Sequence, residues 1–429
     1  MKLLQRLLIS LLLLLSTPLN SFAVYEYNVA VNKTGEDYNT ITLAEGALDD
    51  AGDITSTATK CGAWDACTAG TCDAANLTDG ESVTWDGAVS TGTLRHLTST
   101  EYMITVTLGT LDDNDTVTDL TNTFQINGAG DSCQVTIDVY NDDGDLTDSP
   151  TIDGFTTDSD NYIKIHAPSG ERHNGTISTG AKWISGAGVI AILDNYVYIE
   201  WLVITSSTSD GTNYEGLIQP RTGASNSKIQ NNIIYNAINA STGTYTAAIG
   251  SSTQTYTNLY IYNNIIYGSE TDGASFGFGN AGVVLLNNTI YNSGRDGIGI
   301  RHSNSSVTAR NNASFLSATS DYGANIDTRQ TNASEDATGD AGLTSLTASL
   351  QFTNLTGGSE NFHLISGAGL IDTGTDLTTT GNIDIDNYDR DAGGVTWDIG
   401  ADEFIASAGT TGTASISGLN LSGTTISGM

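Results

Sequence analysis

The sequence predicts an all-β protein built as a solenoid of stacked coils, and three observations lead to this fold class. A short motif returns at near-constant spacing: NNIIY at 231–235 and 263–267, NNTIY at 287–291 and, weakened, NNASF at 311–315, with steps of 32, 24 and 24 residues. Within each unit, β-branched stretches alternate with Gly, Asn, Asp and Ser, which is typical of short strands joined by bends. No apolar 3.6-residue period lasts long enough for a helix, so helical solenoids are excluded.

Each 24-residue unit is expected to form one coil. Two or three short strands fit into this length, and coils stack at about 4.8 Å through parallel hydrogen bonds. The doubled Asn has a physical reason, because Asn tolerates the left-handed conformation of a sharp bend and its amide can hydrogen-bond from coil to coil in a ladder. Aliphatic side chains on either side of each pair should stack inside the solenoid: Ile229, Ile261 and Leu285 before it, and Ile234, Ile266 and Ile290 after it.

The amino terminus is typical of a signal peptide over residues 1–23. Basic Lys2 and Arg6 precede an apolar run from Leu7 to Leu15, and SFA at 21–23 is a small-x-small cleavage site. The run is shorter than the about 20 residues that a membrane-spanning helix needs, and no later segment comes close. We therefore expect a secreted or cell-surface protein that begins near Val24 and does not span the membrane.

All four cysteines lie in the first part of the chain, at positions 61, 67, 72 and 133. A leader that directs the chain to an oxidising space favours two disulfides, with three connectivities open. Metal ligation by these thiols is the weaker alternative, because the C-x2-C pairs of a structural zinc site are absent.

Several segments resemble a known superfamily. The NNxIY coils and the Gly-rich strand DGIGI at 296–300 look like the right-handed parallel β-helix (pectin-lyase-like) superfamily, which includes pectate lyases, polygalacturonases and viral tailspikes. Flanking motifs are similar to those of secreted bacterial and phage β-helix proteins of unassigned function: DYNTI at 37–41 before LAEGAL at 43–48, NYIKI at 161–165, GERH at 170–173, FHL at 362–364, IDTG at 371–374 and DIGADE at 398–403. The resemblance implies a right-handed parallel β-helix with a capping helix at its amino-terminal end and a carboxy-terminal closing segment.

The predicted organisation follows from these motifs. Residues 24–165 form an amino-terminal cap and first coils, residues 166–335 the β-helix body, and residues 336–404 a segment that closes the open end. Residues 405–429, rich in Gly, Ser, Thr and Ala, are expected to form a low-complexity tail.

Charge restricts the partners. The formal net charge is -34, with only 15 Lys and Arg, and the acidity is dispersed along the chain. Nucleic acid is therefore excluded as a partner, because phosphate contacts are made by Lys and Arg. An anionic polysaccharide would be repelled unless calcium bridged the two surfaces.

An aspartate column is the first candidate site. Asp272, Asp296 and Asp321 are spaced by 24 and 25 residues, which places them at the start of the same strand on neighbouring coils. Carboxylates stacked within about 5 to 6 Å could hold calcium or act as a catalytic pair, or each could cap a turn.

A lyase-like cluster is expected just downstream. Arg301 should point outward, with His302 at the end of its strand and Asp327 and Arg329 in the next coil, and Asp296 is a further catalytic candidate. β-Elimination needs a base and a cation, and these residues with calcium could supply both. An exposed ion pair between Arg301 and Asp327 is the structural alternative. The paired aspartates and Gly-His-Gly signature of polygalacturonases are absent.

Two further sets complete the candidates. Tyr235, Tyr267 and Tyr291 form a column that makes a platform for sugar rings if it faces outward, or an ordinary aromatic stack if it faces inward. Two acidic loops carry oxygen ligands at spacings that calcium can use, the first with Asp143 and Asp145 and the second with Asp384 and Asp386.

Two function classes remain. The repeats and the lack of a catalytic signature favour a secreted or cell-surface module that presents an extended glycan-binding, adhesive or structural surface. The alternative is a polysaccharide lyase or glycoside hydrolase that acts along the coils; its main support is the resemblance, and fold-level analogy is a poor warrant for activity. The expected partner in both classes is a polysaccharide or cell-surface glycan, and the expected cofactor is calcium.

Overall fold

The computed structural model describes most of the chain between residues 24 and 405. Within these limits it leaves out 35–37, 51–58, 65–81, 98–100, 112–114, 119–122, 156, 187–188, 208–215, 239–245, 253, 255, 278–280, 303–305, 378–380 and 393–395. The predicted signal peptide, the tail from residue 406 on, Cys67 and Cys72 lie outside the described residues.

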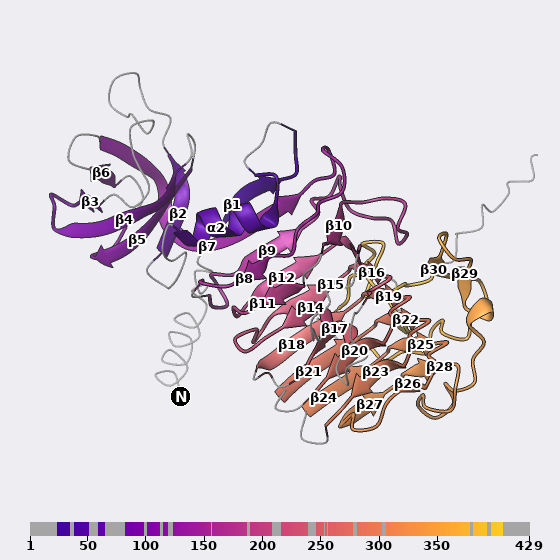
Figure 1. The fold of residues 1–429 in the computed structure, drawn as a ribbon. Helices are drawn as coiled ribbons and strands as arrows, with labels where there is room; N and C mark the ends of the chain where they lie inside the picture. Colours follow the sequence, from indigo (N-terminus) through magenta and orange to yellow (C-terminus); the bar gives the residue numbers. More distant parts are fainter. Residues whose placement is uncertain are drawn as a thin grey trace, which may run out of the picture.

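The body is a right-handed parallel β-helix, as predicted, with three sheets that run side by side along its axis (Figure 1). Sheet A contains β9 (Ile163–His166), β12 (Val197–Glu200), β15 (Lys228–Gln230), β18 (Thr257–Tyr262), β21 (Ala281–Leu286), β24 (Ser306–Arg310) and β27 (Thr328–Gln330). Sheet B contains β10 (Lys182–Ser185), β13 (Val203–Ser206), β16 (Ile233–Tyr235), β19 (Ile265–Tyr267), β22 (Thr289–Tyr291), β25 (Ala313–Phe315) and β28 (Ala333–Ser334). Sheet C contains β8 (Thr151–Ile152), β11 (Ile190–Ile192), β14 (Gly216–Pro220), β17 (Ala247–Ser251), β20 (Asp272–Phe276), β23 (Asp296–Ile300) and β26 (Ser320–Tyr322).

The predicted aliphatic stacks fill the interior. Ile229, Ile261 and Leu285 occupy matching positions in sheet A and are fully buried. Ile234, Ile266 and Ile290 do the same in sheet B. These columns belong to one continuous apolar core, which supplies most of the stability of a solenoid because each coil can bury its apolar face only against its neighbours.

The doubled asparagines divide two tasks between them. The first member takes the left-handed conformation at the bend between sheets A and B, with φ of 54° at Asn231 and Asn263 and 52° at Asn287. The second member builds the predicted ladder: Asn264 donates from Nδ2 to Asn288 Oδ1 at 3.0 Å, and equivalent bonds join the other coils. The second Asn of each pair also donates to a backbone carbonyl of the preceding coil, so each ladder member connects three coils.

The amino-terminal region combines coils with an antiparallel sheet that the sequence analysis did not foresee. Strand β1 (Val24–Val31) pairs in parallel with the end of β7 (Thr123–Val139), and β7 then pairs with β9, so these are the first coils. The predicted capping helix is confirmed as α2 (Ile41–Asp50), with Ile41 and Ala44 buried. The antiparallel strands are β2 (Thr59–Trp64), β3 (Ser82–Trp85), β4 (Ser90–Leu97), β5 (Glu101–Leu108) and β6 (Thr116–Thr118).

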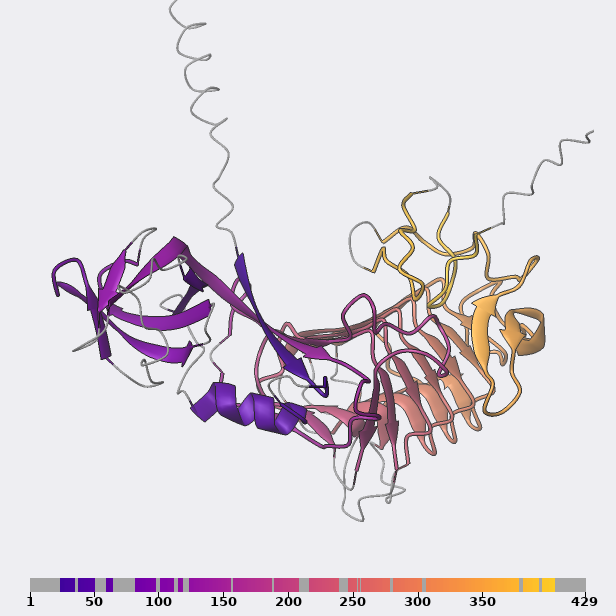
Figure 2. The same cartoon turned by 90° about the horizontal axis from the view of Figure 1, so that it is seen from above.

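This antiparallel sheet projects beyond the first coils (Figure 2). Strands β3 and β4 are joined by a hairpin turn at 86–89, where Asp86, Gly87 and Ala88 have positive φ. A disulfide between Cys61 and Cys133 links β2 to β7 and so connects the sheet to the solenoid.

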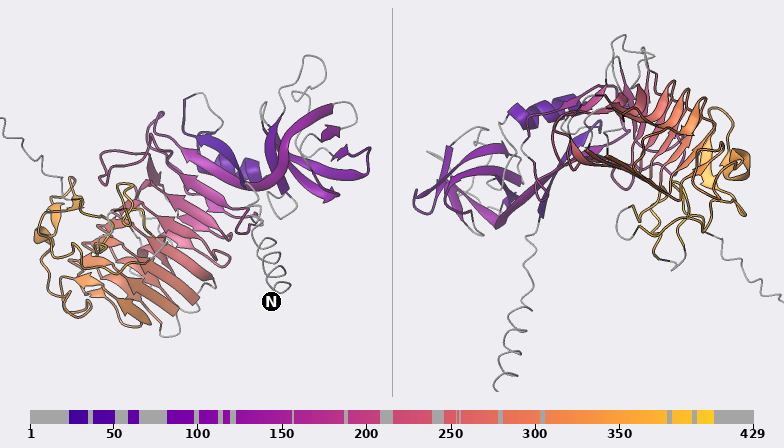
Figure 3. Two further views of the ribbon diagram at one scale, coloured as in Figure 1. Left: turned by 180° about the vertical axis from the view of Figure 1, so that it is seen from behind. Right: turned by 90° about the horizontal axis from the view of Figure 1, so that it is seen from below.

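The closing segment lies both at the end and along the side of the solenoid. Asp340 accepts hydrogen bonds from Asn332 and thereby ends the asparagine ladder at the last coil. The chain then forms η2 (Ala348–Leu350) and the hairpin of β29 (Phe352–Asn354) and β30 (Asn361–Leu364). Residues after 370 run back along the bend between sheets A and B (Figure 3), where Asn231 and Asn263 donate to backbone carbonyls of residues 381–384.

Among the described residues, no helix is both long and apolar enough to cross a membrane.

Candidate functional site

The structure brings two of the three column aspartates together on sheet C. Asp272 and Asp296 begin the adjoining strands β20 and β23, and Asp296 donates its backbone N–H to Asp272 Oδ1 at 3.0 Å. The strand register pairs Asp296 with Ser320, so Asp321 lies one position further along its strand. The spacing of 25 residues in place of 24 is the reason, because a shift of one residue changes the position of a side chain on the sheet.

Both aspartates belong to an ion-pair network. Arg295 donates to the two carboxylate oxygens of Asp272 at 2.7 and 2.8 Å, and Arg301 contacts Asp272 and also donates to Asp296 at 2.7 Å. Gly299 leaves the necessary room, because a Cβ there would lie 2.6 Å from the Arg301 guanidinium. Asp272 is fully buried, so its charge is balanced by these two cations and not by solvent.

The predicted pairing of Arg301 with Asp327 is corrected by this network. Asp327 is exposed and accepts the Val307 N–H at 2.9 Å, one coil away from the partners that Arg301 contacts. His302 follows Arg301 and is half-buried. Among the described residues, Arg301 and Asp296 therefore engage each other and Asp327 is held by the Val307 N–H, so these members of the predicted lyase-like cluster are bound to protein groups.

Asp321 behaves as a turn cap. Its Oδ2 accepts the N–H groups of Glu335 and Asp336 at 2.8 and 3.2 Å, and its Oδ1 accepts that of Ser317 at 3.3 Å. Burial raises the pKa of this carboxyl, while the hydrogen bonds oppose the change. The arrangement supports the structural alternative for this aspartate.

The tyrosine column lies outside the apolar interior of the solenoid but is covered. The rings of Tyr235 and Tyr267 stack at 5.7 Å, and Phe362 of the closing hairpin packs on Tyr267 at 5.1 Å and on Tyr291 at 5.5 Å. Tyr235 and Tyr267 are buried, and Tyr291 is half-buried. These rings hold the closing segment on sheet B, which corrects the expectation of an exposed platform for sugars.

The two acidic loops differ in how their carboxylates are engaged. Asp143 accepts from Thr34 at 3.0 Å, and Asp145 lies 3.6 Å from Lys182. Asp384 is buried and accepts three backbone N–H groups, those of Asp386, Tyr388 and Glu403. Asp384 therefore shapes the loop, whereas Asp386 is exposed and contacts His363 at 3.0 Å.

The outer face of sheet A is the surface that sequence reasoning missed. Side chains alternate along a strand, so the residues that flank the buried column of Ile199, Ile229 and Ile261 point outward. The His166 column, defined by the strand register, contains His166, Glu200, Gln230, Tyr262, Leu286 and Arg310. The Tyr198 column beside it contains Lys164, Tyr198, Lys228, Tyr260, Val284 and Thr308. Applying the two-residue period to the inward isoleucines would have found both columns.

The His166 column contains polar atoms that are buried and have no partner within the described chain. They are His166 Nδ1, Gln230 Oε1 and Arg310 Nε. His166 Nε2 is engaged with Asp138 at 2.7 Å, so only the second ring nitrogen is unsatisfied. Buried polar groups are nearly always hydrogen-bonded, because an unmade bond costs about 1 to 3 kcal/mol, and each exception calls for a ligand, a water or another cause.

The Tyr198 column adds aromatic rings and cations. Lys228 Nζ lies 4.3 Å from the centroid of the Tyr198 ring, and Tyr162 packs on the same ring at 4.6 Å. Burial lowers the pKa of Lys228, and the nearby Glu200 carboxylate opposes this shift. Glu200 forms no salt bridge within 4.0 Å among the described residues. Its carboxylate nevertheless raises the pKa of both Lys228 and Arg172 through its charge, against the lowering by burial.

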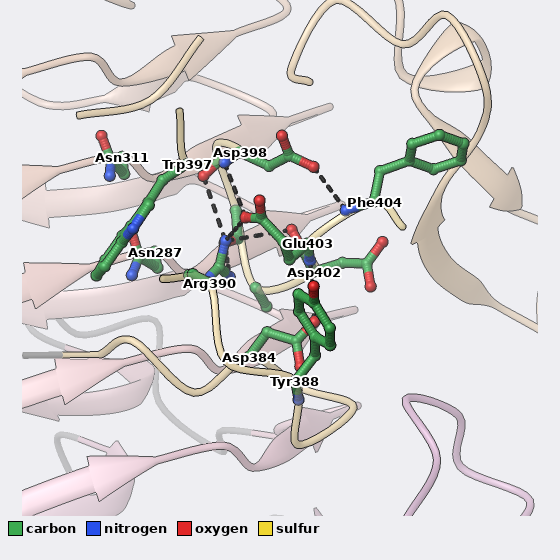
Figure 4. Close-up of polar contacts among 12 residues, drawn as sticks. Asn287, Asn311, Asp384, Tyr388, Arg390, Trp397, Asp398, Asp402, Glu403 and Phe404 are labelled. Atoms are coloured by element: carbon green, nitrogen blue, oxygen red, sulfur yellow. Dashed lines mark hydrogen bonds and ion pairs between the residues drawn. The ribbon is translucent and has the colours of Figure 1, made fainter. Parts of the chain in front are cut away.

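The closing segment borders this face. Gly381 lies against Tyr262, since a Cβ at Gly381 would lie 3.4 Å from the ring. Arg172 donates to Asn387 at 3.1 Å, and its guanidinium lies 4.5 Å from the centroid of the Trp201 ring. Behind this border, Arg390 is fully buried and donates to Glu403 at 2.8 Å and to a backbone carbonyl at 2.9 Å (Figure 4). This loop, held by a buried ion pair, therefore lies beside the two columns.

No family model matches the sequence, and no curated protein matches it significantly. Among solved structures, the crystal structure of pectate lyase Pel9A is similar over 64% of this chain and 88% of that chain, with 13% sequence identity and a TM-score of 0.27. The fold assignment rests on the strand pairing described above.

Proposed function

We propose that the protein binds an acidic polysaccharide outside the cell through the outer face of sheet A. The observation that carries this proposal is the set of buried, unpartnered polar atoms in the His166 column. A polysaccharide offers hydroxyl groups to polar side chains and apolar ring faces to aromatic side chains, and the two adjacent columns contain both kinds of side chain.

The repeat of the fold suits a repeating ligand. Coils stack at about 4.8 Å, so equivalent side chains recur along the solenoid axis at a distance comparable to one unit of an extended chain. A ligand that follows the axis would meet Gln230, Tyr262 and Arg310 in sequence order. Modules of this kind bind through many modest contacts rather than through one deep pocket.

Charge favours a polysaccharide with carboxylates. The chain carries only 15 Lys and Arg in 429 residues, yet Lys164, Lys228 and Arg310 share this face and Arg172 stands at its border. A local cationic surface reduces the repulsion that the overall charge of -34 would impose on an anionic ligand. Calcium, expected as a bridge, becomes a supplementary contact in this proposal.

Retention in native gels that contain one polysaccharide each tests the proposal. We expect pectate, alginate or another uronic-acid polymer to slow the wild-type chain, and Lys228→Gln to lose most of this retention. Lys182→Gln is the matched control, because Lys182 is a half-buried lysine near the ring of Tyr235 on sheet B. Absence of retention in every gel, or an equal loss in both variants, would contradict the proposal.

A lyase activity is the second candidate, and one observation favours it. Lys228 is a lysine whose pKa is lowered by burial, on a face with other cations. As a base it would take the proton next to a uronic carboxylate, the electron pair would form a carbon–carbon double bond, and the glycosidic oxygen would leave. New ultraviolet absorbance from unsaturated ends, lost in Lys228→Gln, would establish it; retention without absorbance would leave a binding module.

A further inference from the structure

The closing segment brings together three side chains of types that can ligate a metal ion, and the proposed glycan surface uses none of them. His363 lies on β30, Asp386 in the loop after the fully buried Ile385, and Asp402 near the end of the described chain. One ligand atom from each lies within 4.8 Å of the other two. The three residues come from stretches separated by 23 and 16 positions, so their convergence is a product of the fold.

The hydrogen bonds of His363 orient its ring as in a metal site. Nδ1 lies 2.5 Å from Asn361 Oδ1, an amide oxygen that can only accept, so Nδ1 carries the proton. In the neutral ring, Nε2 then directs a lone pair at Asp386 Oδ1, 3.0 Å away. Two acceptors at this distance repel each other unless a cation or a proton lies between them. Ligating histidines commonly donate their other ring N–H to an oxygen in this way.

Asp402 supplies an independent observation. The residue is 5% exposed, and its Oδ2 accepts the Leu364 N–H at 2.6 Å. In the part of the chain that is described, its other carboxylate oxygen accepts no hydrogen bond. The nearby cation does not compensate it, because the Arg390 guanidinium is paired with Glu403 and Asp402 points away from it (Figure 4). This second oxygen can therefore ligate an ion, and the charged groups that act on Asp402 are His363, Asp384 and Asp386.

We propose that His363, Asp386 and Asp402 bind a divalent transition metal ion of the zinc class. One imidazole nitrogen and two carboxylate oxygens form a ligand set that zinc accepts, whereas calcium takes oxygen ligands alone. Zinc bonds of about 2.1 Å at tetrahedral angles separate neighbouring ligand atoms by about 3.4 Å, close to the distance between His363 Nε2 and Asp386 Oδ1. Exposed Asp386 gives an ion access from solvent, and water can complete the coordination.

The bound ion would fasten the closing segment. It would connect the hairpin that packs on the tyrosine column with the loop that borders the outer face of sheet A and with the chain's last described stretch. Gly175 abuts the cluster, since a Cβ there would lie 2.4 Å from the His363 ring, so the ion would also hold the loop at 170–180 in place. The proposal is independent of glycan binding, because it depends on none of the residues of the two columns.

Calorimetric titration of the full mature chain, after treatment with a chelator, tests the site. We expect one zinc ion per chain to bind, with a melting temperature raised by several degrees, and little response to calcium or magnesium at the same concentration. His363→Gln and Asp386→Asn should each weaken zinc binding at least tenfold. His302→Gln is the matched control, as a half-buried histidine outside the cluster, and should bind as the wild type does.

Cobalt provides a second readout. Co²⁺ in place of zinc should give the intense visible absorption of a four-coordinate site, and His363→Gln should abolish this absorption. Asp386 is exposed, so its variant keeps the test valid if His363→Gln fails to fold. Zinc binding that is absent, or equal in the wild type and Asp386→Asn, would overturn the proposal and leave a protonated His363 between two carboxylates.

Discussion

The outer faces of sheets A and C carry polar side chains on the same coils, but they differ in how these side chains are satisfied. On sheet C, the carboxylates of Asp272 and Asp296 are engaged by Arg295 and Arg301 at hydrogen-bonding distance. On sheet A, Gln230 Oε1 and Arg310 Nε are buried without partners, whereas on sheet C the corresponding atom is a hydroxyl, Ser275 Oγ. Both faces look polar in the sequence, so polarity alone does not identify a binding surface.

The partnered charges of sheet C and the unpartnered atoms of sheet A have different consequences for stability and for ligand binding. Breaking an ion-pair network in which every charge has a partner lowers the free energy of unfolding, because each removed partner leaves a charge buried and unpaired. An unsatisfied column costs stability in the free protein and regains it when a ligand supplies the missing bonds. Variants on sheet C should therefore affect unfolding, and variants on sheet A should affect binding.

The largest expected effect is on sheet C. Asp272→Asn removes the charge that two guanidinium groups share and should lower the free energy of unfolding by about 3 kcal/mol, at the lower end for a broken buried pair because both arginines are partly exposed. Denaturant titration measures this loss. Asp327→Asn, an exposed aspartate of the neighbouring coil, should change stability by less than about 1 kcal/mol; equal losses in the two variants would contradict the buried network.

Two histidines extend the comparison to pH. His173 is saturated, with Nε2 bonded to the Asn231 carbonyl at 2.8 Å, and burial lowers its pKa to about 4, whereas His166 keeps an unpartnered nitrogen. The unfolded chain binds the proton with a pKa of 6.5, so the stabilising contribution is complete above this value and is lost as the pH falls from 6.5 towards 4.

The loss attributable to His173 should reach at most about 3 kcal/mol. Unfolding curves of the wild type and His173→Gln across this pH range measure it, since the remaining groups titrate alike in both. A slope with pH that is the same in both proteins would show that His173 does not carry this dependence.

The asparagine pairs offer a comparison within one coil. Asn264→Ala removes a ladder member whose side chain makes five hydrogen bonds to four residues, and it should cost about 2 kcal/mol of global stability. Asn263→Gly keeps the left-handed bend but removes the amide that holds the closing segment, so global stability should change less.

Hydrogen exchange distinguishes the two effects. We expect faster exchange confined to residues 381–404 in Asn263→Gly, and faster exchange across sheets A and B in Asn264→Ala. The same pattern in both variants would show that the two asparagines do not divide their tasks.

The repeat predicted the solenoid because each coil needs the same bend and the same inward aliphatics, and 24-residue steps record both. The sequence did not predict the partners of Arg301, since these depend on the path of its side chain over Gly299 into the preceding coil. It also did not predict that Phe362 would cover Tyr267, because the hairpin reaches sheet B from a segment almost 100 positions away. The spacing of the repeats predicts the contacts between coils, but it does not predict the contacts between the coils and the closing segment.

The smallest expected effect concerns the tyrosines. Tyr260→Ala should weaken polysaccharide binding about threefold to tenfold, because a half-buried ring of the Tyr198 column loses its contact, and should alter stability little. Tyr291→Ala should leave binding unchanged, because its ring packs on Phe362. Binding isotherms with the polysaccharide that gives the strongest gel retention measure both; a larger loss in Tyr291→Ala would return the binding surface to sheet B.

A pair of glutamines compares polysaccharide binding by sheets A and C. Gln230 on sheet A has a buried, unpartnered Oε1, whereas Gln219 on sheet C accepts from Arg221 at 2.7 and 3.0 Å. Titration calorimetry of the same uronic-acid polysaccharide into Gln230→Ala and Gln219→Ala compares the two faces with one chemical change. We expect about tenfold weaker binding in Gln230→Ala and wild-type affinity in Gln219→Ala. Wild-type affinity in Gln230→Ala, with a loss in Gln219→Ala, would show that sheet A is not the binding surface.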